Sequence, residues 1–234
     1  MRNPSALPTS ADRDLDAVAN LIADPARAAM LAALAGGRAL PAGELARRAG
    51  VHPATASAHL RRLTEGGLIR VRVQGRHRFH EIVNPEVATV LDAIAQIAPP
   101  APVRSLKQQR VARDLFEART CYDHLAGRRG VQLRDRLLAV GAIRTLDDRD
   151  HELTDRGQYL LDELDIDLAT LRASRRVFAR SCVDWTDRRV HLAGALPAAV
   201  TSFFLTHGWL TRGPGRSLRV AGGYDDNVEK WLAS

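Results

Sequence analysis

The sequence is poor in several residue types and patterns that define whole protein classes. Two cysteines in 234 residues are too few for a disulfide framework, so a reducing cytoplasm is the expected compartment. Aromatic residues make up only 5%, so the core must consist mostly of Leu, Val, Ile and Ala. No apolar run reaches 18 residues and no signal peptide precedes the first expected helix, so neither a membrane span nor export is expected.

Motifs of common enzyme classes are also missing. The patterns GxGxxG, GxxxxGKS/T, GxSxG and HExxH do not occur. The acidic run Asp147-Asp148-Arg149-Asp150 has the composition of a charged hairpin tip rather than of a catalytic pair. We therefore expect no enzyme activity.

Positive charge is concentrated in residues 40–83. The chain has a formal net charge of +7, and this segment holds eight arginines against three glutamates. Its pattern predicts a helix, a tight turn, a second helix and a two-stranded ribbon, which is the order of a winged helix-turn-helix. A concentrated positive field on a shape that fits a DNA groove is typical of a DNA-binding protein.

Particular residues mark the turn, the second helix and the ribbon. Gly50 can adopt the left-handed conformation that the turn between the helices needs. The buried face of the helix 53–65 is marked by apolar residues at i, i+4 and i+7, namely Ala56, Leu60 and Leu63. Gly75-Arg76 supplies the turn of the ribbon.

The exposed faces of the second helix and the ribbon carry the candidates for contacts with DNA. These are Thr55, Ser57, His59, Arg61, Arg62, Arg72, Arg76 and Arg78. Helix residues would contact base edges, and Arg76 would contact phosphates or the minor groove. The alternative is an amphipathic helix pair and a hairpin with a solvated arginine face. Motif, spacing and charge together favour DNA binding.

Six short segments carry a resemblance to a known family. They are Asp24-Pro25-Ala26-Arg27 with Met30-Leu31-Ala32-Ala33-Leu34, then Glu44-Leu45-Ala46, then residues 57–63, then Gly67-Leu68-Ile69-Arg70, and Gly75-Arg76. Through them, residues 15–98 resemble the ArsR/SmtB family of bacterial winged-helix repressors. The resemblance implies a homodimer that binds double-stranded DNA, with one recognition helix per subunit in successive major grooves of a palindromic operator. It also implies that a signal releases the protein from DNA.

The chain departs from this family at its usual metal sites. Metal-sensing members often carry a cysteine pair on the helix that here contains residues 41–46, and no cysteine stands there. Others place Asp and His ligands on the helix after the ribbon. Here that helix, residues 85–97, has Glu86 and Asp92 but no histidine. The family is also near 100 residues long, whereas this chain continues for about 130 more.

Composition predicts the domain organisation. Residues 1–14 are expected to be a disordered tail, and residues 15–98 the domain for DNA binding and dimerisation. Pro99-Pro100-Ala101-Pro102 favours an extended linker, so residues 99–118 are expected to hold a linker and a connecting helix. Residues 119–234 would form a C-terminal effector or interaction domain.

An internal repeat occupies the C-terminal domain, with copies at 119–157 and 180–222. Arg119-Thr120-Cys121-Tyr122-Asp123 is echoed by residues 180–184, and residues 124–127 recur identically as 191–194. Each copy also echoes the winged-helix unit, but with an interval six residues shorter. We therefore expect a mainly α fold with small β-wings, in which two abbreviated winged-helix-like repeats follow the N-terminal winged helix-turn-helix. The shortening is expected to remove about one and a half turns from the reading helix.

The repeat supplies two sets of residue types that bind metal ions. They are Cys121, Asp123 and His124 in one copy, and Cys182, Asp184 and His191 in the other. If the copies pack about a local pseudo-twofold axis, the sets could converge. Three readings stay open: purely structural roles, a sensor of an organic ligand or of thiol chemistry, and a transition-metal site.

Aromatic residues gather in the same domain. Tyr122, Trp185 and Trp209 are the candidates for lining a small-molecule pocket, with core packing as the alternative.

The sequence as a whole predicts a dimeric winged-helix transcriptional regulator, most simply a repressor released by an effector bound in the C-terminal domain. The rivals are an architectural DNA-binding protein without an effector, and a cytoplasmic metal- or thiol-responsive sensor whose DNA role is secondary.

Overall fold

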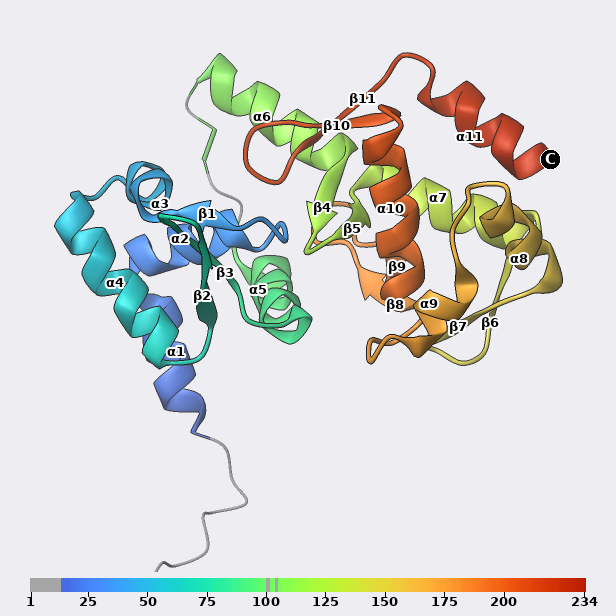
Figure 1. Cartoon of the computed structure of the whole chain (residues 1–234). Coiled ribbons are helices and arrows are strands. Elements are labelled where there is room, and N and C mark those ends of the chain that lie inside the picture. Colours follow the sequence, from blue (N-terminus) through green and yellow to red (C-terminus); the bar gives the residue numbers. More distant parts are fainter. Residues whose placement is uncertain (1–13, 100–101, 104) are drawn as a thin grey trace, which may run out of the picture. The chain divides into compact units, whose positions relative to one another are not determined.

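The computed structural model describes residues 14–99, 102–103 and 105–234 (Figure 1). The chain forms two compact units. Unit 1 contains the residues up to Ala32 together with Ala39–Val83, and unit 2 contains Ala33–Arg38 together with Asn84–Ser234. The expected tail lies outside the described residues except for Asp14, whose carboxylate caps the first helix by accepting a hydrogen bond from the backbone nitrogen of Ala17.

Unit 1 is a winged helix-turn-helix, as the sequence predicted. Its helices are α1 (Leu15–Ala23), α2 (Pro25–Leu34, whose last two residues fall in unit 2), α3 (Ala42–Ala49) and α4 (Pro53–Glu65). Its strands are β1 (Leu40–Pro41), β2 (Ile69–Gln74) and β3 (His77–Ile82), which form an antiparallel sheet in the order β1-β3-β2. The hairpin of β2 and β3 is the wing, and Gly75-Arg76 forms its turn between the paired residues Gln74 and His77.

The expected turn and buried face are both present. Gly50 ends α3 with a φ of 66°, in the left-handed region that an L side chain avoids, and its N–H bonds back to α3 carbonyls. The buried residues of α4 are the predicted ones, Ala56, Leu60 and Leu63. They belong to a core of mainly aliphatic side chains, which also includes Met30, Leu31, Leu40, Leu45, Leu68, Ile69 and Ile82.

The corner between α1 and α2 is held by the segment that carried part of the family resemblance. Asp24 Oδ1 accepts a hydrogen bond from the backbone nitrogen of Arg27 at 2.9 Å. The buried guanidinium of Arg27 donates to the carbonyl oxygens of Asn20 and Leu21 at 2.6 and 2.7 Å. A cation therefore satisfies carbonyl groups at the end of α1 that have no partner within the helix.

Unit 2 consists of short helices and two-stranded hairpins. Its helices are α5 (Pro85–Ile97), α6 (Leu106–Glu117), α7 (Arg128–Ala139), α8 (Asp155–Asp162), α9 (Leu168–Ala173), α10 (Ala195–Thr206) and α11 (Tyr224–Ala233). Its strands are β4 (Arg119–Cys121), β5 (His124–Ala126), β6 (Ile143–Thr145), β7 (His151–Leu153), β8 (Arg180–Val183), β9 (Val190–Ala193), β10 (Leu210–Arg212) and β11 (Leu218–Val220). They pair as the antiparallel hairpins β4-β5, β6-β7, β8-β9 and β10-β11.

The boundary between the units differs from the predicted one. The sequence placed residues 85–98 with the DNA-binding domain and treated 99–118 as linker and connecting helix. In the structure the division falls after Val83. The reason lies in contacts that pattern analysis does not reveal: Asp92 of α5 bonds to Cys121 and Arg216, and α6 packs against α7, β4 and β11.

Both repeats have the same order of elements: a hairpin, a helix, a second hairpin and a further helix. The expected shortening of the reading helix is wrong. The helices α7 and α10 have 12 residues each, against 13 in α4. What the repeats lack is the first helix of the helix-turn-helix, because the segment aligned with α3 pairs as strand β5 with β4.

The two repeats pack reciprocally. Helix α7 lies against β9 of the second repeat, and α10 lies against β5 of the first (Figure 1). Two isolated β-bridges also join the repeats. Arg119 of the first repeat pairs with Ser217 of the second, and Asp150 of the first pairs with Arg180 of the second. These partners occupy equivalent places in the two copies, so the repeats are related by the local pseudo-twofold arrangement that the sequence had raised.

One hydrophobic core serves both repeats. It joins Leu125, Leu133, Leu137, Ile143, Leu160 and Leu161 to Leu192, Leu196, Val200, Phe204, Leu210, Leu218 and Trp231. Phe204 is fully buried at its centre, stacked on Trp209 at 4.9 Å and edge-on to Tyr224 and Trp231. Because residues of both copies share this one core, the two repeats form a single packed body.

Among the described residues, no single helix is long and apolar enough to cross a membrane. The helices α1 and α2 reach the necessary length and composition only as a pair, with a bend of 94° between them.

The position of Phe204 generates a stability prediction. Replacing it (Phe204→Ala) should lower the free energy of unfolding by about 3–5 kcal/mol, because a large side chain is lost from a site that cannot collapse. Its neighbour Phe203 is only partly buried, so Phe203→Ala is the matched control and should cost clearly less. Urea denaturation measures both, and equal losses would contradict the central place of Phe204.

Candidate functional site

The outer face of α4 carries most of the predicted DNA-contacting residues. Thr55, Ser57, Arg61 and Arg62 are exposed, whereas the opposite face is buried in the unit 1 core. Ser57 Oγ donates to the carbonyl oxygen of Pro53 at 3.0 Å, so the hydroxyl keeps its capacity to accept a hydrogen bond. Arg61 lies 3.9 Å from Glu65, and both side chains are exposed. An ion pair in water is weak, so Glu65 holds the Arg61 side chain only weakly.

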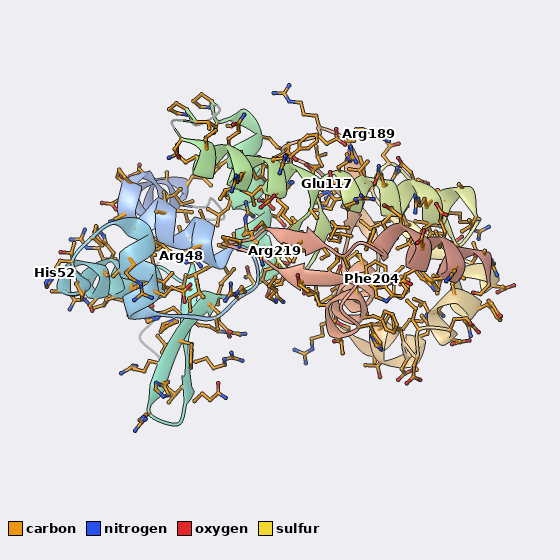
Figure 2. The ribbon with its side chains drawn as sticks, turned by 90° about the horizontal axis from the view of Figure 1, so that it is seen from above. Arg48, His52, Glu117, Arg189, Phe204 and Arg219 are labelled. Atoms are coloured by element: carbon orange, nitrogen blue, oxygen red, sulfur yellow. The ribbon has the colours of Figure 1, made fainter. Side chains whose placement is uncertain are left out.

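The wing presents a second basic surface. Arg72, Arg76 and Arg78 are exposed, and Val73 near the tip is 65% exposed, so the outer half of the wing is solvated on both faces. Figure 2 shows side chains spreading from both sides of this hairpin. Glu81 lies 2.8 Å from Arg70 and 3.8 Å from Arg72. Within the described part of the chain, Arg62, Arg76 and Arg78 have no carboxylate partner, so their charges are available to an anion.

Two histidines of α4 differ from the sequence interpretation. His59, expected at the flank of the DNA face, is half-buried, and its Nδ1 lies 3.8 Å from Asp24. His52, which the sequence analysis did not consider, caps α4 by accepting a hydrogen bond from the backbone nitrogen of Ala54 at 3.4 Å. Figure 2 labels His52 at this helix start. Helix capping by histidine has no strong sequence signal, since Ser, Thr, Asp and Asn are the usual caps.

Unit 2 brings together four of the six candidate ligand residues. Cys121 and His124 are paired residues at the end of the β4-β5 hairpin, and Cys182 and His191 are paired residues of β8-β9. One ligand atom from each lies within 4.8 Å of the ligand atoms of the other three. We call these four residues the thiol–imidazole cluster. Three of them are buried, and Cys182 is half-buried.

The two aspartates lie next to this cluster rather than in it. Asp123 forms a double hydrogen bond with Arg176, at 2.6 and 3.0 Å, and Asp184 accepts from Arg119 at 2.9 Å. Each aspartate also approaches Nδ1 of the histidine in its own repeat. The distances are 3.6 Å from Asp123 to His124 and 3.5 Å from Asp184 to His191.

The environment sets opposite protonation preferences for the two thiols, whose sulfur atoms are 3.9 Å apart. The contact with Cys121 lowers the pKa of Cys182, with help from His124 and His191 and against the effect of burial. The same contact with Cys182, together with burial and the charge of Asp92, raises the pKa of Cys121. Burial opposes charge on His124, but Asp123 and Cys182 raise its pKa. The cluster therefore favours one thiolate.

Sequence reasoning missed the polar partners of Cys121. Its Sγ donates a hydrogen bond to Asp92 Oδ2 at 2.7 Å, and Arg216 Nη1 donates to Asp92 Oδ1 at 2.9 Å. The sequence offered one signal: Asp92 stands four residues after Ala88, and so on the same side of α5. In the structure both residues are buried. Nothing in the sequence indicated that Arg216, far along the chain, would be its partner.

A cavity of about 420 Å³ opens beside the cluster. Cys121, His124 and Cys182 line it, and Arg149, Arg175 and Arg180 are among the other lining residues. Of the three predicted pocket aromatics, only Tyr122 lines it. Trp209 packs in the core against Phe204, and Trp185 lies under the guanidinium of Arg119 at 4.5 Å, so the pocket interpretation of these two tryptophans is corrected.

Comparisons with known proteins find a family profile for part of the chain, similar solved structures and a curated relative. The profile of a helix-turn-helix domain family matches residues 22–72. Among solved structures, the chain is similar to the cadmium metal sensor CMTR from Mycobacterium tuberculosis, at 27% identity, covering 39% of this chain and 99% of that one, with a TM-score of 0.32. It is also similar to the homodimeric winged helix-turn-helix DNA-binding domain Mb0332 from Mycobacterium bovis, at 26% identity, covering 42% and 100%, with a TM-score of 0.33.

A curated relative matches most of the chain, both units included. It is the uncharacterized HTH-type transcriptional regulator YdfF of Bacillus subtilis (strain 168), which is 42% identical over 204 residues, covering 87% of this chain and 90% of the relative. Because the match spans nearly the whole of both proteins, this chain belongs to the family of HTH-type transcriptional regulators that includes YdfF.

Proposed function

We propose that this regulator binds a palindromic operator as a homodimer, represses transcription there, and is released from DNA by an effector bound in unit 2. The observation that carries the proposal is the joint exposure of the α4 face and the wing, with Arg62, Arg76 and Arg78 lacking carboxylate partners in the part of the chain described. Arginine side chains on a groove-sized helix and on a wing fit base edges and phosphates respectively.

Exposed apolar residues on α5 support the proposal that a second copy of the chain is the partner. Val90, Ile94 and Ile97 are exposed at i, i+4 and i+7, so they form one stripe, and Ile97 is 85% exposed. A stripe of this kind on one helix is typical of a surface that another protein covers. In a twofold dimer the same stripe serves both subunits, and the twofold axis matches a palindromic operator.

The thiol–imidazole cluster and its cavity support the effector role of unit 2. A protein that only bends or packages DNA has no need for a buried group of titratable residues beside a cavity, so these features favour a sensor over an architectural factor.

We place the regulator in the compartment that holds its DNA, a reducing cytoplasm, where Cys121 and Cys182 stay as thiols. Operator binding measured with and without metals, oxidants and a metabolite panel tests this role.

The DNA interface can be tested by comparing affinities for specific and random duplexes. Ser57→Ala and Arg61→Ala should each weaken binding to the operator by about 1–3 kcal/mol where the side chain contacts a base edge. Arg76→Ala should weaken binding to every sequence and reduce the salt dependence by about one ion, as loss of a phosphate contact does.

The matched control is Arg172→Ala, which removes an exposed arginine of α9 in unit 2. This variant should bind the operator like the wild type. Wild-type affinity in Ser57→Ala, Arg61→Ala and Arg76→Ala as well would remove the case for α4 and the wing as the reading surface.

The dimer can be tested by light scattering at micromolar concentration, where the wild type should have about twice the chain mass. Ile94→Glu should shift the protein to monomer, because it puts a charge in the middle of the apolar stripe. Leu146→Glu changes an exposed apolar residue of the β6-β7 turn and should leave the mass unchanged. A wild type that is monomeric with and without DNA would defeat the dimer proposal.

A further inference from the structure

We propose that Cys121, His124, Cys182 and His191 bind one divalent ion of the zinc class in a four-coordinate site shared by the two repeats. Ion binding itself goes beyond the proposed function and does not depend on it. Only the further step, that this ion is the effector, rests on the proposed function.

The backbone brings the four side chains to one place. In each repeat a cysteine and a histidine are cross-strand partners, so both point to the same side of their hairpin. Strands β5 and β9 lie against each other, which joins the two pairs. A tetrahedral zinc site with Zn–S bonds of about 2.3 Å separates its two sulfur atoms by about 3.8 Å. The sulfur atoms of Cys121 and Cys182 are 3.9 Å apart.

The imidazole groups lack other partners. Both ring nitrogens of His124 and both of His191 are buried without a hydrogen bond, which is costly for a polar atom. Each Nδ1 faces the carboxylate of the neighbouring aspartate, Asp123 or Asp184. An imidazole that donates its Nδ1 hydrogen to a carboxylate presents Nε2 to a metal, and metal-binding histidines usually have such a partner.

The charges also fit a divalent cation. Two thiolates neutralise one divalent ion, while the imidazoles bind as neutral groups. Three carboxylates beside the cluster have arginine partners, which offset their charge: Asp123 pairs with Arg176, Asp184 with Arg119, and Asp92 with Arg216.

The donor set decides which ion fits. Two sulfur and two nitrogen ligands in a tetrahedral arrangement suit zinc or cadmium, whereas magnesium and calcium prefer oxygen ligands. Four protein ligands leave no open position, so the ion would cross-link the two repeats rather than activate water. The cavity lined by Cys121, His124 and Cys182 provides a path by which the ion can enter.

The decisive experiment uses the full chain, purified with a non-thiol reductant. Elemental analysis after zinc loading should give one ion per chain. Substituted Co²⁺ should give the near-ultraviolet charge-transfer band of a thiolate complex and the intense visible bands of a tetrahedral ion. Failure to bind zinc or to develop the Co²⁺ spectrum would overturn the site, whatever the variants do. Cysteines that resist reduction because they are joined as a disulfide would overturn it too.

Variants assign the ligands. Cys182→Ser and His191→Gln should each lose the Co²⁺ charge-transfer and tetrahedral bands or shift them strongly. The control is His151→Gln, because His151 is also buried with unpartnered nitrogens but lies outside the cluster. This variant should keep the full spectrum. Should a ligand variant fold with a wild-type spectrum, the assignment of that residue is wrong.

The carboxylates beside the histidines have a separate test. Asp123→Asn should weaken zinc affinity about 10- to 100-fold while keeping one ion per chain, as expected for loss of a group that orients a ligand. Asp135→Asn is the matched control, since Asp135 is also a partly exposed aspartate paired with an arginine, Arg189. Equal affinities for the two variants would show that Asp123 does not orient His124.

Operator binding separates this proposal from the proposed function. Zinc-loaded and zinc-free protein should differ in operator affinity by at least tenfold if the ion is the effector. One bound zinc with unchanged operator affinity would leave the site in place and overturn its effector role. No bound zinc, with operator binding that responds to another compound, would overturn the site and leave the proposed function standing.

Discussion

The buried ion pair of Arg119 and Asp184 is the contact on which unit 2 depends. Both side chains are fully buried, and they come from different repeats. A buried charge is tolerated only with a partner and further hydrogen bonds, and Asp184 also accepts from the backbone nitrogen of Gly127 and from Thr186. Arg119 therefore fixes the first hairpin against the loop of the second, and with it the places of all four cluster residues.

The pseudo-twofold relation of the repeats holds for the order of their elements and is broken in side-chain pairing. By sequence, Asp123 corresponds to Asp184 and Arg180 to Arg119, yet Asp123 pairs with Arg176. Asp92 adds a further difference, because it bonds to Cys121 and no equivalent group reaches Cys182 among the described residues. Symmetric hairpins thus supply matching ligands, while asymmetric neighbours give the two thiols different pKa values.

Helix α5 joins the cluster to the DNA-binding unit along the chain. It begins three residues after the end of β3, and its Asp92 bonds to Cys121. The same helix carries the exposed apolar stripe assigned to the dimer. In the proposed function, a change at Cys121 would therefore act on α5. This helix directly follows the wing in the chain and forms part of the proposed subunit interface.

The sequence by itself determined the elements whose patterns are local. Periodicity and turn residues predicted α4, its buried face and the wing, and self-similarity predicted the repeat and the matching cysteines and histidines. Only the tertiary structure decided what depends on distant partners: the move of α5 into unit 2, the inward turn of His59, and the roles of Asp123 and Asp184 beside the cluster rather than in it. A carboxylate has the same chemistry as a ligand, a cap or an ion-pair partner, and its role is fixed by the arginine that folding brings to it.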